Sequence, residues 1–201
     1  MEPVHSVSMN NIKTIAVFCG SSVGNNPLYE QKAIDLGSSL FNNQIGLVYG
    51  GGSRGLMGVV AKTVYTLGGS VTGVLPEALN LASVRQSVVE TELIIVPTMH
   101  ERKARMYALA DAFIALPGGI GTFEEFLEVF TWLQLGYHHK PVALLNTAGF
   151  YDPLLHLFRH SSSEGFLHQD LLDTLVVEED ENLLLKRMQG ISLMMKDKLA
   201  P

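Results

Sequence analysis

Seven short apolar runs recur along the chain, and longer amphipathic stretches separate them. Each run is continuously hydrophobic, which is typical of a strand covered on both faces in a parallel sheet. The runs are residues 14–19 (TIAVFC), 46–49 (GLVY), 70–75 (SVTGVL), 92–96 (ELIIV), 112–116 (AFIAL), 141–145 (PVALL) and 174–177 (TLVV). The stretches between them predict helices near residues 27–43, 56–68, 99–110, 122–136, 153–163 and 180–189. This alternation predicts an α/β fold with a doubly wound, mostly parallel sheet and helices on both faces.

Length and composition predict a single domain around one buried core. The chain has 201 residues, 47% of them hydrophobic, and a mean hydropathy of +0.21, which excludes a disordered protein. We expect residues 13–190 to form the domain, residues 1–12 a loose N-terminal arm and residues 191–201 a C-terminal tail. No apolar run is long enough to span a membrane, and the first dozen residues carry no hydrophobic signal core. We therefore expect a cytoplasmic protein with no membrane partner.

The net charge and the cysteine content argue against further classes of protein. A net charge of −6 argues against a general nucleic-acid binder, whose affinity rests on a basic face. A small phosphorylated ligand is still compatible, because backbone N–H groups can hold an anion whatever the net charge. Cys19 is the only cysteine, and His138 and His139 have no partner at metal-ligand spacing. We expect neither a disulfide framework nor a metal site.

Three of the predicted strands lead into loops rich in glycine. These loops are residues 20–24 (GSSVG), 50–58 (GGGSRGLMG) and 117–122 (PGGIGT). In a doubly wound sheet, ligands bind outside the carboxyl ends of the strands. Glycine lets a ligand approach the backbone N–H groups, and a following helix adds unpaired donors. Any one loop is as readily a tight turn, but three at one sheet edge favour a phosphate-bearing ligand.

The second loop also matches the dinucleotide pattern G-x-G-x-x-G. The match runs through Gly50, Gly52 and Gly55, and Glu77 follows about twenty residues later. An NAD-dependent oxidoreductase is therefore an alternative function. The pattern normally belongs to the first strand–helix turn, whereas here it follows the second strand, which weakens this alternative.

Two charged segments are candidates for the chemistry. Thr122 and Glu125 open a predicted helix, and their spacing alone favours a capping box over catalysis. Residues 99–106 (MHERKARM) predict a helix that begins at the same sheet edge as the glycine loops. A charge run is more often a solvated face, but Arg102 or Lys103 could reach a phosphate or a leaving base from there.

One motif is specific enough to indicate a family. The segment PGGIGTFEE at residues 117–125 fits P-G-G-x-G-T-x-x-E and resembles the hallmark of the LOG ("Lonely guy") family of cytokinin riboside 5′-monophosphate phosphoribohydrolases. Members of this family have often been labelled lysine decarboxylases. Four further segments resemble family motifs in family order, so the resemblance covers roughly residues 13–190: FCGSSVG (18–24), YGGGSRGLMG (49–58), MHERKARM (99–106) and TWLQLGYHHKP (131–141).

The resemblance implies a Rossmann-like fold, a homodimer and a hydrolase without cofactor. Its substrate would be an N⁶-substituted adenosine 5′-monophosphate, and its products the free base and ribose 5-phosphate. By motif, Glu125 is the catalytic carboxylate and Arg102 its essential partner, so the catalytic interpretation of Glu125 replaces the capping box. The residues expected to bind the substrate and its phosphate are Ser21, Gly51, Gly52, Gly55, Met57, Gly58, Met99, Lys103, Gly118, Gly119, Gly121 and Thr122.

The expected chemistry agrees with these residue types. Cleavage of an N-glycosidic bond develops oxocarbenium character at the anomeric carbon, as in glycoside hydrolysis. An ionised Glu125 could stabilise that charge or activate the attacking water. Three alternatives stay open: a nucleotide carrier or sensor with the same loops but no turnover, the NAD-dependent oxidoreductase, and a pyridoxal phosphate decarboxylase, for which no Schiff-base lysine is marked. The sequence also leaves open whether the substrate is a cytokinin nucleotide or AMP.

Overall fold

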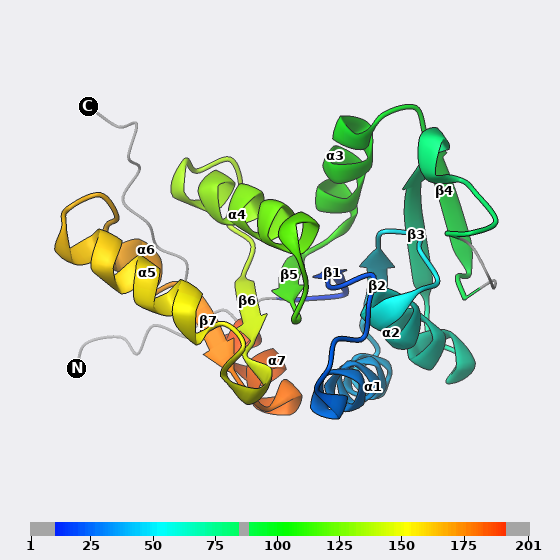
Figure 1. The fold of residues 1–201 in the computed structure, drawn as a ribbon, viewed down its shortest axis with the longest axis horizontal. Coiled ribbons are helices and arrows are strands. Elements are labelled where there is room, and N and C mark those ends of the chain that lie inside the picture. Colours follow the sequence, from blue (N-terminus) through cyan, green and yellow to red (C-terminus); the bar gives the residue numbers. More distant parts are fainter. Residues whose placement is uncertain (1–10, 85–88, 192–201) are drawn as a thin grey trace, which may run out of the picture.

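The computed structural model describes residues 11–84 and 89–191, and its centre is one parallel sheet of seven strands (Figure 1). The sheet order is β4-β3-β2-β1-β5-β6-β7, and every neighbouring pair is parallel. The strands are β1 (Thr14–Phe18), β2 (Gly46–Tyr49), β3 (Val71–Pro76), β4 (Glu92–Val96), β5 (Ala112–Ala115), β6 (Val142–Leu145) and β7 (Leu175–Glu178). The chain runs outward from β1 to β4, returns to β5 and runs outward again to β7. The strand order therefore reverses between β1 and β5, where doubly wound sheets bind ligands.

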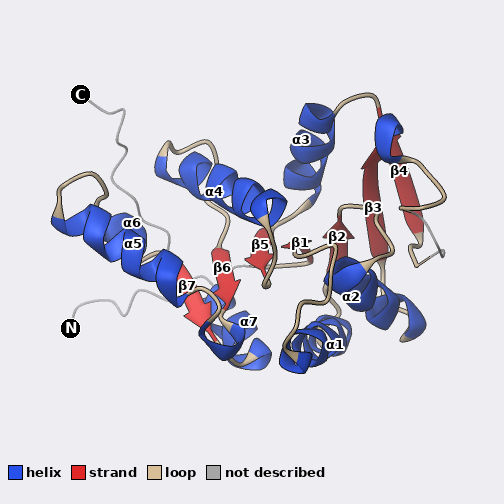
Figure 2. Ribbon diagram, viewed as in Figure 1, coloured by secondary structure: helices blue, strands red, loops and turns tan. Residues whose placement is uncertain are grey.

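Helices cover both faces of the sheet, as the sequence predicted (Figure 2). They are α1 (Pro27–Asn42), α2 (Gly55–Thr66), α3 (Met99–Leu109), α4 (Ile120–Gln134), α5 (Asp152–Ser163), α6 (Gln169–Leu172) and α7 (Glu181–Gly190). Short 3₁₀ turns follow β3 and β6, at Glu77–Leu79 and Thr147–Gly149. The six predicted helices are confirmed within a few residues of their expected ends. The four-residue α6 was missed, because one helical turn is too short to show a periodic pattern.

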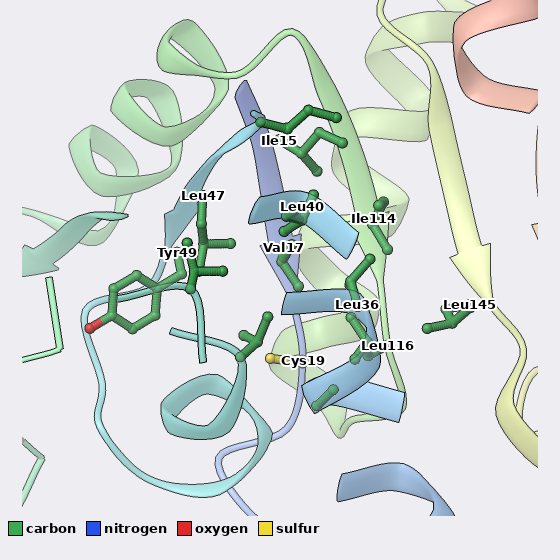
Figure 3. Packing of buried hydrophobic residues seen from close by; sticks show 14 of the residues in the cluster. Ile15, Val17, Cys19, Leu36, Leu40, Leu47, Tyr49, Ile114, Leu116 and Leu145 are labelled. Carbon is green, nitrogen blue, oxygen red and sulfur yellow. The ribbon is translucent and has the colours of Figure 1, made fainter. Parts of the chain in front are cut away.

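Alternate residues of each strand enter two separate cores. Ile15 and Val17 of β1 pack with Leu36 and Leu40 of α1, on the face that α1, α2 and α7 cover (Figure 3). Phe18, next to Val17, points to the opposite face, where α3, α4 and α5 pack. Both faces are apolar, which is why the central strands read as continuous hydrophobic runs.

The strand β4 is an exception to this rule. Its residues are only partly buried, and Ile95 is 38% exposed, because β4 lies at an edge and pairs with β3 alone. The expectation that every run is covered on both faces is therefore wrong for β4.

The predicted domain limits remain a prediction. Ile12, expected in the loose arm, is buried in the core on the α1 face, and Ile191 packs against the same core. Residues 1–10 of the arm and 192–201 of the C-terminal tail lie outside the described residues.

Candidate active site

The three glycine-rich loops meet at the point where the strand order reverses. Gly20, after β1, donates its N–H to the carbonyl of Pro117 after β5, with an N···O distance of 3.1 Å. The carbonyl of Gly20 accepts from the N–H of Met57, in the segment after β2, at 3.3 Å. A cavity of about 320 Å³ lies between the first and third loops, and its lining includes Ser21 and Phe150. The predicted meeting of these loops at one sheet edge is confirmed.

The first turn of α4 presents free space for an anion. Gly119 is the N-cap of α4, and within the described chain no side chain caps this end. A Cβ added at Gly119 or Gly121 would meet nothing within 4 Å. A ligand can therefore approach the unpaired N–H groups of this helix end. Gly118 differs, because a Cβ there would overlap the side chain of the buried Thr122.

The capping-box interpretation of Thr122 and Glu125 is wrong. The helix α4 begins at Ile120, so Thr122 already lies inside its first turn. A threonine side chain caps α3 instead, where Thr98 Oγ1 accepts from the N–H of Glu101 at 3.1 Å. Glu125 is therefore available for a tertiary contact.

That contact joins Glu125 to Arg102. Arg102 Nη1 donates to Glu125 Oε1 at 2.7 Å, which links α3 to α4, and each side chain is only 12% exposed. Arg102 Nε donates to the carbonyl of Val74 in β3 at 3.2 Å. Met99 lies beside the guanidinium, with its Sδ 3.6 Å from Nη1. The two residues expected to carry the chemistry thus form one ion pair near the carboxyl ends of the strands.

The surroundings of Glu125 set the pKa of its carboxyl group. Burial raises this pKa, while the charge of Arg102 and its hydrogen bond lower it. Among the weaker influences, the Glu124 carboxylate raises it and the Lys103 ammonium lowers it. The net effect is a pKa above the ordinary value of a glutamate, which suits a group that exchanges protons.

Lys103 bonds to α4 through two carboxylates. Its Nζ forms ion pairs with Glu124 and, at 3.1 Å, with Glu128. Burial lowers the pKa of Lys103, but the hydrogen bonds to Glu124 and Glu128 and the charges of these two carboxylates together raise it above its ordinary value. Tyr107 donates its hydroxyl to Glu128 Oε2 at 2.6 Å. Sequence reasoning missed Tyr107 and Glu128. Tyr107 lies four residues after Lys103 on α3, and Glu128 lies four residues after Glu124 on α4, so each shares a helix face with a charged residue of this cluster.

The glycines of the second loop mainly fill packing roles. A Cβ at Gly55 would overlap the backbone of Ser21, and a Cβ at Gly58 would overlap the carbonyl of Ser53. Gly51 and Gly55 also have positive φ angles, +74° and +60°, which favour glycine. In the dinucleotide pattern the third glycine also serves close packing, so these contacts of Gly55 fit that pattern and a plain turn equally well. Met57 is partly buried against the core on the α1 face, and a Cβ at Gly52 would lie 3.3 Å from its Cε.

The described residues contain neither a metal-ligand cluster nor a membrane-spanning helix. Across residues 11–84 and 89–191, no cluster of three or more His, Cys, Asp or Glu side chains could hold a metal ion. Within those same ranges, no helix has the length and apolar character needed to cross a membrane.

Solved structures with the same fold include two that bind or carry a molybdenum cofactor. One is a molybdenum cofactor binding protein from Rippkaea orientalis, with a TM-score of 0.65 and 19% identity over 87% of this chain and 93% of that one. The other is a molybdenum cofactor carrier protein from Chlamydomonas reinhardtii, with a TM-score of 0.64 and 22% identity over 88% of this chain and 96% of that one. At such identities the likeness shows the fold alone.

Sequence relatives are much closer. The model of a family described as "Possible lysine decarboxylase" matches residues 57–188. A probable cytokinin riboside 5′-monophosphate phosphoribohydrolase of Oryza sativa subsp. japonica, LOGL1, is 50% identical over 87% of this chain and 78% of its own length. The cytokinin riboside 5′-monophosphate phosphoribohydrolase LOG1 of Arabidopsis thaliana is 46% identical over 90% of this chain and 84% of its own length.

Proposed function

The chain belongs to the LOG family of cytokinin riboside 5′-monophosphate phosphoribohydrolases, and on this premise we propose that it hydrolyses the N-glycosidic bond of an N⁶-substituted adenosine 5′-monophosphate. The products are ribose 5-phosphate and the free base, so the reaction activates a cytokinin or, from AMP, releases adenine. The observation that carries this proposal is the buried Arg102–Glu125 pair beside a helix end suited to phosphate.

The phosphate binds at the first turn of α4 in this proposal. The N–H groups of Gly119, Gly121 and Thr122 supply donors, and the helix dipole favours the negative charge. Ser21 and Gly118 line the cavity beside this turn. Contacts through the phosphate orient the sugar, and their binding energy assists the reaction at the anomeric carbon. The unphosphorylated riboside is therefore expected to be a poor substrate.

The second loop packs against the first loop, which carries Ser21, beside this phosphate site. Gly55 packs on the backbone of Ser21, and Gly58 holds the turn at Ser53. We assign Gly51, Gly52 and Met57 to the same wall of the site, since they belong to this loop.

Glu125 performs the hydrolysis with Arg102. The C1′–N9 bond breaks with its electrons moving to the base, and a water oxygen bonds to C1′. The carboxylate of Glu125 accepts the proton of that water, and its negative charge stabilises the oxocarbenium-like transition state. The same proton then passes to the departing base, which leaves as the neutral free base. Arg102 holds Glu125 and stabilises the negative charge that develops on the departing base. Met99, next to the guanidinium, contacts the base, and Lys103 offsets the charge of Glu124 near Glu125.

The working form in this proposal is a homodimer. The outer side of α4 carries an apolar groove of about 640 Å³ whose lining includes Phe123 and Trp132. Ile120 and Leu127, on the same groove, are 82% and 40% exposed. Exposed apolar surface of this kind marks interaction sites, and a two-fold axis would cover the groove with its own copy.

The test is an incubation of the purified protein with isopentenyladenosine 5′-monophosphate, AMP and the unphosphorylated riboside, with the free base measured by chromatography. We expect base from the monophosphates, little from the riboside and none with Glu125→Gln. Glu124→Gln, one residue away on the same helix, is the matched control and should keep most of the activity. Binding of AMP without release of base from any substrate would refute hydrolysis and favour a nucleotide carrier or sensor.

A further inference from the structure

Gly50 is the one glycine of the G-x-G-x-x-G pattern that neither the phosphate site nor the loop packing uses. It directly follows β2, at the carboxyl edge of the sheet. A Cβ added at Gly50 would overlap Arg102 Nη2 and would lie 3.2 Å from Arg102 Cζ. The guanidinium therefore lies directly against the backbone of Gly50, in the space that any other residue would fill.

The other contacts of the guanidinium fix its orientation over Gly50. Its Nε donates to Val74 in β3 at 3.2 Å, and its Nη1 donates to Glu125 in α4 at 2.7 Å. A planar guanidinium that makes both bonds has little freedom to rotate. A side chain at position 50 would thus push Nη2 away and disturb the bond to Glu125.

The kind of atom that meets each glycine separates Gly50 from its neighbours in the loop. Gly55 and Gly58 lie against backbone atoms, so a Cβ at either position forces the main chain to move. Gly50 lies against the far end of a side chain, which can swing aside without any movement of the main chain. A Cβ at Gly50 is therefore expected to disturb the position of Arg102 and to leave the fold intact.

We propose that Gly50 is a positioning residue for the hydrolysis, because the absence of a side chain there seats the Arg102 guanidinium where it reaches Glu125. This inference rests on the proposed function. It gives the first glycine of the dinucleotide-like pattern a role in holding an arginine.

Displacement of Arg102 changes the charges that surround Glu125. The Arg102 guanidinium is the main influence that lowers the pKa of Glu125 against burial. Without it, Lys103 of α3 still lowers this pKa and Glu124 of α4 still raises it. The thiol of Cys19, directly after β1, also interacts with Glu125. Burial raises the pKa of this thiol, so the thiol stays neutral. The pKa of Glu125 therefore rises when Arg102 moves away, and the acid limb of the pH–rate profile moves to higher pH.

The experiment compares Gly50→Ala with Gly46→Ala. Gly46 is the first residue of β2, the strand that Gly50 directly follows. A Cβ at Gly46 makes only ordinary contacts, the nearest at 3.6 Å to Ser70, so this variant should match the wild type. For Gly50→Ala we expect kcat to fall on the order of 100-fold, since misplacement of a catalytic group by about 1 Å has such effects. KM should change less, the acid limb should move to higher pH, and the melting temperature should fall no further than that of Arg102→Ala, which loses the same buried ion pair.

A double variant shows whether Gly50 acts through Arg102. In an Arg102→Ala background, Gly50→Ala should cause no further loss of residual turnover, because the displaced group is already gone. Equal losses in both backgrounds, or Gly50→Ala activity equal to that of Gly46→Ala, would overturn the proposal. If Gly50→Ala fails to fold, the double variant must recover the melting temperature of Arg102→Ala, and failure to do so also overturns it. A wild type that releases no base refutes the proposed function instead.

Discussion

The proposed catalytic pair, Arg102 and Glu125, combines burial with opposite charge in a small space. Burial disfavours the charged carboxylate, and a single guanidinium restores part of that lost stability. The bond between them is also one of the contacts that join α3 to α4. One hydrogen bond thus serves both the chemistry and the packing of two helices.

A second buried side chain, His138, makes the stability of the fold depend on pH. Burial lowers the pKa of His138 from 6.5 to about 4. Its Nε2 lies 2.8 Å from the carbonyl of Val129, and its Nδ1 accepts from the N–H of Lys140 at 3.1 Å, so the neutral ring has a partner at each nitrogen. Between pH 4 and 6.5 the unfolded chain therefore binds a proton at this ring that the folded chain does not bind.

The melting temperature is therefore expected to fall as the pH is lowered from 6.5 towards 4. Scanning calorimetry at several pH values measures this fall. The variant His138→Gln cannot titrate, so its melting temperature should fall less over the same range. His139→Gln, at the exposed neighbouring position, is the control and should follow the wild type; equal falls in both variants would contradict the prediction.

At the scale of elements, the sequence predicted what depends on local pattern and missed what depends on tertiary contact. The strands were found because continuous apolar runs follow from burial on both faces. The capping threonine was misassigned because the pattern T-x-x-E occurs at Thr98 and again at Thr122. Tertiary structure separates the two, because the side chain of Glu125 bonds to Arg102 on α3.

The site residues show the same division between local sequence pattern and tertiary contact. The family motifs indicated which residues gather at the sheet edge, because order along the chain fixes the loops that meet there. They did not indicate that Gly55 and Gly58 contact the protein's own backbone, since a Gly-rich loop has the same sequence whether it faces a ligand or packs on itself.

The helices α3 and α4 are linked by Tyr107, and its hydroxyl can be removed alone. Tyr107→Phe loses the bond to Glu128 but keeps the edge contacts of the ring with Phe113 and Trp132. We expect the free energy of unfolding to fall by about 1.5–3 kcal/mol, the range for a hydrogen bond to a charged group. Urea denaturation measures this change. Tyr137→Phe, at an exposed position, is the control and should change little; an equal loss there would contradict a specific role of Tyr107.

The helices α1 and α2 approach closely at Gly37. A Cβ there would lie 2.9 Å from Thr63 Cβ and 3.2 Å from the carbonyl of Val60. Alanine normally stabilises a helix interior by up to about 1 kcal/mol over glycine. We nevertheless expect Gly37→Ala to lower the melting temperature, because the two helices must separate. Gly190→Ala, where a Cβ meets nothing within 4 Å, should be neutral or stabilising. Stabilisation by Gly37→Ala would show that the helices separate without cost.

At the scale of the whole molecule, α4 serves two surfaces at once. Its first turn and Glu125 face the sheet edge where the glycine loops meet, and its outer side carries the apolar groove proposed as a dimer interface. Any partner on that groove therefore contacts the same helix that carries Glu125, the proposed catalytic carboxylate.

This arrangement predicts that charge on the groove separates the subunits. Leu127→Asp should convert the dimer to a monomer, because a carboxylate buried in an apolar interface without a partner is costly. Analytical ultracentrifugation measures the mass in solution. Leu157→Asp, at an exposed position of α5, is the control and should leave the dimer intact. A dimer that persists in Leu127→Asp would place the interface elsewhere.

The reversal of strand order has a consequence for biosynthesis. The chain builds β1 to β4 and α3 before it returns across the sheet to β5 and α4, so Arg102 leaves the ribosome before Glu125. A nascent chain that has formed only the first half of the sheet holds the arginine without its acid. If the proposed pair carries the reaction, activity arises only after β5 and α4 are made, and activity during synthesis would report that the two halves of the sheet have joined.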